Sequence, residues 1–180
     1  MIYHVAIMGS VKKNALFSAS LFEKMCHEAE TLISSKVCHD LSRVHLVSGG
    51  NAWSQHVAMT LYLSHKYHGL TLCLPCEWDF TLHKFKQFDN LYNVHHAYFA
   101  SQLSFNPWDQ LEKFIEAHPQ DIRYCDNLSQ RNSLIAKKCT TLLLFSWVEK
   151  TNENSSLWQK FHGKSRFQLP LESIDKMKMN

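Results

Sequence analysis

The chain has only five glycines, and each stands where an apolar run or an amphipathic stretch ends. Gly9 follows the apolar run 2–8, and Gly49 and Gly50 follow the apolar run 44–48. Glycine permits positive φ and the close approach of another group. A glycine between a buried strand and a helix is how nucleotide-binding α/β proteins place a phosphate over free helix N–H groups. The pattern predicts a ligand site at the ends of two strands.

Short apolar runs alternate with segments of helical periodicity along the whole chain. Strands are predicted at 2–8, 44–48, 70–74, 123–125, 140–148 and 165–169. Helices are predicted at 14–35 with Asn14 as N-cap, from Asn51 to a C-terminal Gly69, and at 91–103, 108–118, 129–138 and 157–162. Residues 79–90 show little periodicity, which indicates a loop.

This alternation predicts βαβ units and an α/β fold, a Rossmann-like three-layer sandwich with a mainly parallel sheet flanked by helices. Residues 1–174 are expected to form one domain and residues 175–180 a frayed C-terminal tail. Ligands of such sheets bind beyond the carboxyl ends of the strands, near the point where the strand order reverses. Gly9, Gly49, Gly50 and the loop after Val148 are all expected at that edge.

Composition excludes several classes of protein. No apolar run reaches the roughly 20 residues that span a bilayer, and the N-terminus reads as a strand, not a signal peptide. A cytoplasmic protein without a membrane partner is therefore expected. The net charge of +3 is too small to indicate a nucleic-acid partner. The six cysteines lie mostly within apolar segments, where reduced cysteine behaves as a small hydrophobic residue.

The segment HLVSGGNAWSQHVAM, residues 45–59, together with MIYHVAIMGS at the N-terminus, resembles the SLOG superfamily. This Rossmann-like group joins DprA-type proteins to the cytokinin-activating phosphoribohydrolases, the LOG proteins. CLPCEWD resembles the third strand of the group, LSQRNSLIAKKCTTLLLF its Arg-Asn helix and following strand, and SSLWQKFHGKSRFQLPL its closing helix and strand. The resemblance covers most of the chain and implies binding of a nucleotide and assembly into a homodimer or a higher homo-oligomer.

The chain departs from the phosphoribohydrolases at their second glycine-rich loop. Those enzymes carry Pro-Gly-Gly-x-Gly-Thr-x-x-Glu, whose backbone holds phosphate and whose Glu assists cleavage of the N-glycosidic bond. The corresponding stretch here runs from Glu153 to Trp158 without glycine, and the acidic position after Gly50 is Gln55. The resemblance therefore implies ligand recognition more than hydrolysis.

The candidate ligand-binding residues carry backbone N–H groups, hydroxyls, amides or cations suited to a phosphate, a ribose or a base. Trp53 is suited either to stacking on a base or to packing on the sheet. An exposed turn or a helix cap is the competing interpretation for most of the others. The set is Gly9, Ser10, Lys12, Gly49, Gly50, Asn51, Trp53, Arg131, Asn132, Ser155 and Ser156.

Glu77 and Asp79 flank Trp78 beyond the third strand and are the candidate catalytic carboxylates, for general-base work or contact with ribose hydroxyls. A solvated loop is the competing interpretation. Cys73-x-x-Cys76 and His95-His96 are compatible with metal ligation, but no second ligand pair has suitable spacing. No metal ion and no cofactor is expected.

Three functions are compatible with these features. The first is binding of an ADP-ribose-like ligand, a nucleoside monophosphate or a cyclic nucleotide at the carboxyl edge of the sheet. The second is a nucleoside 5′-monophosphate phosphoribohydrolase or another N-glycosidic hydrolase, in which Glu77 or Asp79 would replace the missing Glu. The third is a non-enzymatic interaction protein that keeps the scaffold without the pocket.

Overall fold

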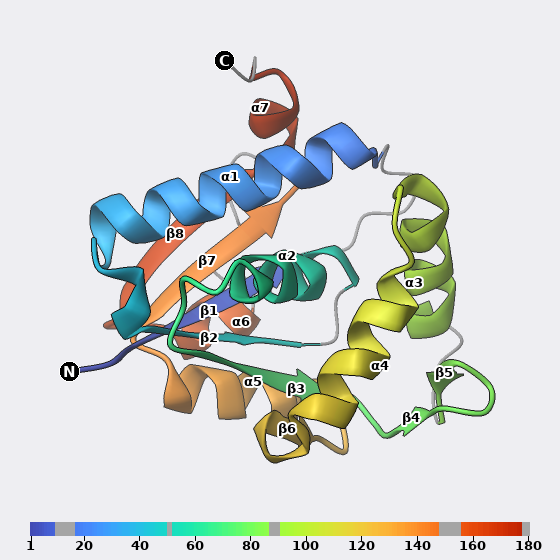
Figure 1. The fold of residues 1–180 in the computed structure, drawn as a ribbon. Helices are drawn as coiled ribbons and strands as arrows, with labels where there is room; N and C mark the ends of the chain where they lie inside the picture. Colours follow the sequence, from blue (N-terminus) through green and yellow to red (C-terminus); the bar gives the residue numbers. More distant parts are fainter. Residues whose placement is uncertain (10–16, 50–51, 87–90, 148–155, 178–180) are drawn as a thin grey trace.

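The computed structural model describes residues 1–9, 17–49, 52–86, 91–147 and 156–177, with only the backbone of residues 91, 92 and 156. A six-stranded sheet in the order β6-β3-β2-β1-β7-β8 forms the centre of the fold (Figure 1). Every pairing in this sheet is parallel. Its strands are β1 (Tyr3–Gly9), β2 (Val44–Ser48), β3 (Gly69–Leu74), β6 (Ile122–Tyr124), β7 (Thr141–Ser146) and β8 (Ser165–Pro170).

Helices cover both faces of the sheet, which makes three layers (Figure 1). In β1, Val5 and Ile7 join the larger apolar cluster under α1, α2 and α7, whereas Ala6 and Met8 join a smaller cluster under α5 and α6. Helices α3 and α4 add to the first layer. The helices are α1 (Ala19–Lys36), α2 (Ala52–Leu63), α3 (Leu91–Gln102), α4 (Pro107–Ala117), α5 (Leu128–Lys138), α6 (Ser156–Lys160) and α7 (Leu171–Asp175), with 3-10 turns η1 (Leu41–Arg43) and η2 (Pro119–Asp121). None of the helices among the described residues combines the length and apolarity needed to cross a bilayer.

Helix α2 occupies the middle of its layer and is buried nearly all round. Every residue from Ala52 to Met59 is buried, which is the pattern of a helix enclosed by other elements rather than lying at the surface. Its polar residues therefore need internal partners. The imidazole Nδ1 of His56 donates to Gln110 Oε1 of α4 at 2.6 Å, which ties α4 to α2.

The structure confirms the predicted fold class, and the predicted strands agree with the observed ones to within two residues at either end.

Three local predictions need correction. Gly69 does not end a helix: α2 stops at Leu63, and Gly69 is the first residue of β3. Residues 79–90 contain part of a hairpin, β4 (Trp78–Asp79) and β5 (Lys84–Phe85), because Trp78 and Phe85 are buried and pack edge to face. The side chain that caps α1 is that of Ser18, whereas Asn14 lies outside the described residues.

Position 49 requires glycine because there is no room for a side chain, and not because its backbone has a positive φ. A Cβ on Gly49 would lie 1.8 Å from the carbonyl oxygen of Cys73 in the adjacent strand β3. Only Gly163 has a positive φ among the described glycines. The chain therefore leaves β2 in contact with the backbone of β3, and any side chain at position 49 would force these strands apart.

The buried His56 and the half-buried His45 lie in surroundings that oppose protonation. Burial lowers the pKa of His56 to about 4. Burial also lowers the pKa of His45 to about 4. The charges of His4, His68 and Lys138 lower this pKa further, and the charge of Asp121 opposes them. The rings of His4 and His45 lie 5.1 Å apart, at the amino ends of β1 and β2. Both His45 and His56 are therefore neutral in the folded protein at neutral pH.

Replacing Gly49 by alanine should lower the free energy of unfolding by about 3 kcal/mol, because the new methyl group meets backbone that cannot rotate away. Gly9→Ala is the matched control. There the nearest atoms are side-chain atoms of Ser54 and Trp53 at 3.2 Å, and the expected cost is about 1 kcal/mol or less. Urea unfolding followed by circular dichroism measures both, and equal costs would contradict the packing account.

Stability should fall as the pH drops from about 6.5 to about 4. The reason is that His45 and His56 have lowered pKa values in the folded state, so the unfolded chain binds more protons in this window. Urea unfolding at a series of pH values should show a flatter decline for His45→Gln and His56→Gln than for the wild type. The exposed His27→Gln variant is the control and should keep the wild-type slope, and unchanged slopes in all three variants would refute this origin.

Candidate functional site

The carboxyl ends of β1 and β2 and the start of α2 come together at one edge of the sheet. β1 pairs in parallel with β2 on one side and with β7 on the other. Ser48 Oγ at the end of β2 donates to the carbonyl of Ile7 at 2.6 Å. A Cβ on Gly9 would lie 3.2 Å from both Trp53 Nε1 and Ser54 Cβ, in the first turn of α2. The structure therefore brings Gly9 and Gly49 to the same edge, as the sequence predicts.

The strand order reverses between β1 and β7. From β1 the chain moves outward through β2, β3 and β6, and then crosses to the other side of β1 to form β7 and β8. Crevices at such reversals, beyond the carboxyl ends of the strands, are the usual ligand sites of open α/β sheets. Gly9 ends β1 at this reversal, and Trp147 directly follows β7 there.

Two buried indole N–H groups lie at this edge. Trp53 is 2% exposed and Trp147 is 9% exposed, and both belong to the apolar cluster on the α1–α2 face. Neither Nε1 has a hydrogen-bond partner within the described part of the chain. A buried N–H without a partner costs about 1–3 kcal/mol. The edge thus carries donors suited to the oxygen atoms of a ligand.

Arg131 and Asn132 lie within α5 on the opposite face of the sheet from α2. The guanidinium of Arg131 is buried and donates through Nε and Nη2 to the Asn132 side-chain oxygen at 3.2 and 3.0 Å. Its charge lowers the pKa of the Cys125 thiol, against the larger effect of burial, which raises that pKa. Arg131 therefore lies near the ends of β3 and β6, on the α5 face of the sheet. Its contact with a ligand stays a prediction.

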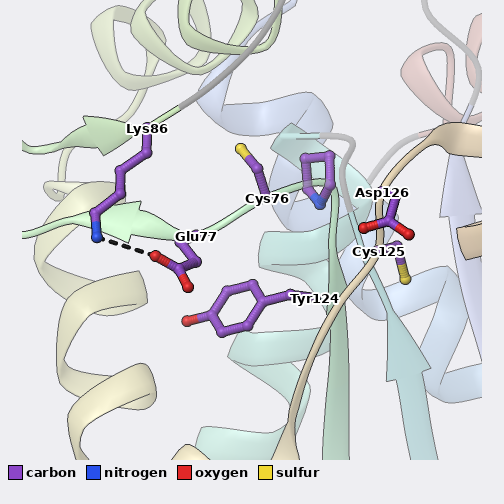
Figure 2. Close-up of a pocket in the computed structure, with 7 residues that line it drawn as sticks. Cys76, Glu77, Lys86, Tyr124, Cys125 and Asp126 are labelled. Carbon is purple, nitrogen blue, oxygen red and sulfur yellow. Dashed lines mark hydrogen bonds and ion pairs between the residues drawn. The ribbon is translucent and has the colours of Figure 1, made fainter.

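A partly open cavity of about 540 Å³ lies at the carboxyl ends of β3 and β6 (Figure 2). Glu77, one of the predicted catalytic carboxylates, lines it. Glu77 Oε2 accepts from Lys86 Nζ at 3.0 Å, and this bond raises the pKa of Lys86. The full lining is Pro75, Cys76, Glu77, Lys86, Tyr124, Cys125 and Asp126.

Asp79, the other predicted catalytic carboxylate, holds the β4–β5 turn. Its Oδ1 accepts from the backbone N–H groups of Thr81 and Leu82 at 2.9 and 3.0 Å. Asp79 is not part of the cavity lining. A local structural role accounts for this residue, while its predicted catalytic role stays a prediction.

Several predicted ligand-binding residues fall outside the described residues. These are Ser10, Lys12, Gly50, Asn51 and Ser155. Ser156 is described only as the first residue of the short helix α6.

Cys73 and Cys76 show no arrangement suited to metal binding. Within the described ranges, no group of three or more His, Cys, Asp or Glu side chains is placed to hold a metal ion. Cys73 is fully buried in β3, and burial raises the pKa of its thiol to about 11. At neutral pH this thiol is protonated, and it packs as a small apolar side chain.

Sequence reasoning did not select Lys86, Tyr124, Asp126 or Trp147 as site residues. Tyr124 ends β6 and Asp126 follows it, and this three-residue strand is too short to show a clear periodicity. Lys86 lies in the segment predicted as a loop. Trp147 could have been selected from the sequence, because it lies at the carboxyl end of the most apolar predicted strand, which ends beside Gly9; Phe145, the register partner of Gly9, lies two residues before it.

Comparisons with known proteins give one informative relative. The chain is 28% identical to "Uncharacterized protein R261" of Acanthamoeba polyphaga mimivirus over 174 residues, which cover 93% of this chain and 95% of that protein. No family model matches the chain. No solved structure matches it. The fold and the site thus rest on the geometry described above.

Proposed function

We propose that this protein binds a nucleotide or a nucleotide-derived small molecule, with the phosphate at the carboxyl ends of β1 and β7. The observation that carries the proposal is the pair of buried indole N–H groups, Trp53 Nε1 and Trp147 Nε1, at the reversal of strand order. Phosphate oxygens would accept from these donors and remove the cost of leaving them unpaired.

The start of α2 adds to this support. Helix α2 is 12 residues long, begins beside Gly9 and has no acidic residue in its first turn. The N-terminus of a helix carries a partial positive charge, which favours an anion. Gly9 has no side chain that would occupy the space beside Trp53 and Ser54. The resemblance to the SLOG superfamily agrees with this placement and adds a homo-oligomer to the proposal.

The hydrolase alternative receives less support. Its two candidate carboxylates are engaged elsewhere, Glu77 with Lys86 and Asp79 with the backbone of the hairpin turn. Recognition of a ligand without cleavage is therefore the function that the geometry favours. Chromatographic detection of released base after incubation with nucleoside monophosphates tests the alternative directly.

Trp53→Phe and Trp147→Phe should each weaken binding of the nucleotide by roughly tenfold, because each removes one donor to a charged acceptor and keeps the aromatic ring. Isothermal titration calorimetry with ADP-ribose, nucleoside monophosphates and cyclic nucleotides measures the effect. Neither variant loses a hydrogen bond in the absence of ligand, but the smaller ring leaves a cavity that lowers the unfolding temperature. A thermal unfolding transition therefore establishes that each variant is folded before its affinity is compared.

Trp158→Phe is the matched control, because Trp158 packs on the α5–α6 face beside Arg166. Its affinity should equal that of the wild type. Absence of binding across the whole panel would refute the proposal, as would nucleotide affinities that neither Trp53→Phe nor Trp147→Phe changes. Light scattering on the same samples tests the homo-oligomer.

A further inference from the structure

We infer that the cavity at the ends of β3 and β6 is the subsite for the nucleoside end of the ligand, a planar ring with hydroxyl or amino donors. This inference rests on the proposed function, since it concerns the same ligand. The volume of about 540 Å³ falls within the range of small-molecule sites.

The charges that line the cavity disfavour a phosphate and favour hydrogen-bond donors. Two carboxylates, Glu77 and Asp126, and one ammonium, Lys86, line the cavity, and Lys86 lies beside Glu77 and away from Asp126 (Figure 2). Lys86 is already engaged by Glu77, and the Asp126 carboxylate has no hydrogen-bond partner among the described residues. Ionised carboxylates only accept hydrogen bonds, so they match the hydroxyl groups of a ribose or the amino group of a base.

Tyr124 supplies an aromatic surface on the same cavity. It is 48% exposed, and it extends from β6 toward Glu77 across the cavity (Figure 2). Burial and the charge of Glu77 raise the pKa of its phenol, so the hydroxyl stays a donor at neutral pH. An exposed tyrosine ring can stack on a planar base of any identity.

The cavity and the phosphate site lie on one edge of the sheet at a separation that one ligand can bridge. β3 is two strands from β1 and β6 is three, and adjacent strands are about 4.8 Å apart, so the ends of β3 and β6 lie about 10 and about 14 Å from the end of β1. The acidic cavity and the α2 N-terminus would together orient the ligand, with the phosphate toward β1 and the ring toward β6.

Calorimetry with AMP, ribose 5-phosphate, adenosine and inorganic phosphate tests this orientation. The wild type should bind AMP about tenfold more tightly than ribose 5-phosphate, because only AMP carries the stacking base. Tyr124→Leu should abolish this preference, whereas Tyr124→Phe, which retains the ring, should keep it. Asp126→Asn should weaken AMP and adenosine binding by about fivefold and leave inorganic phosphate unchanged.

Tyr98→Leu and Glu116→Gln are matched controls, since both residues are exposed on helices outside the cavity. Both should bind AMP as the wild type does. Unfolding temperatures establish that each variant is folded before its affinity is compared.

The outcomes separate the inference from the proposed function. If AMP and ribose 5-phosphate bind equally well, or if Tyr124→Leu keeps the preference for AMP, the inference is overturned and the phosphate site stands. If adenosine binds as tightly as AMP and Tyr124→Leu weakens both, the cavity is supported and the phosphate site is overturned. If no compound of the four binds, the inference is overturned, and the proposed function is then decided by titration with ADP-ribose and cyclic nucleotides.

Discussion

The close contact between Gly49 and the carbonyl of Cys73 determines how the centre of this molecule is built. Because position 49 carries no Cβ, the chain leaves β2 in contact with the backbone of β3, and α2 begins at Ala52. Helix α2 then lies deep against β1, β2 and β3, with eight consecutive residues buried from Ala52 to Met59. The first turn of that helix consequently stands beside Gly9, and the candidate phosphate site depends on this placement.

Burial of α2 also explains why the core of this face contains polar and aromatic groups together. His56 bonds to Gln110 of α4, and its ring stacks on Phe99 of α3 at 5.3 Å. The same histidine connects three helices, so a proton on it would place a charge where no described group offers a negative partner. The expected loss of stability in acid is therefore a consequence of the arrangement that fixes α2 beneath the other helices.

The carboxyl edge of the sheet carries two regions of opposite electrostatic character. At β1 and β7 the described groups are indole N–H donors and a helix N-terminus, which attract an anion. At β3 and β6 two carboxylates outnumber the single ammonium, which attracts hydrogen-bond donors. A nucleotide has the same division between its phosphate and its nucleoside, and this correspondence is the physical basis of the proposed orientation.

Prediction from the sequence succeeded where a local pattern decides the structure. The run 44–48 is a strand as predicted, and the helix predicted at 108–118 is α4 (Pro107–Ala117), because capping by Asn106 and apolar periodicity act over a few residues. Gly69 was misjudged, since a glycine that follows a helix looks the same in sequence whether it caps the helix or opens a strand. The hairpin was missed because its stability comes from Trp78 and Phe85 packing against each other and not from alternation along the chain.

The sequence by itself determined that strands and helices alternate, that the sheet is mainly parallel and that Gly9 and Gly49 lie at one edge. These properties follow from hydrophobic spacing and from the length of the connections. Only the tertiary structure decided that Gly49 packs against the backbone of β3 and that Asp79 accepts hydrogen bonds in the β4–β5 turn. It also decided which residues surround one cavity, namely Glu77, Lys86, Tyr124 and Asp126. Those assignments depend on contacts between segments distant in the chain, and nothing in the local order of residues encodes which segments will meet.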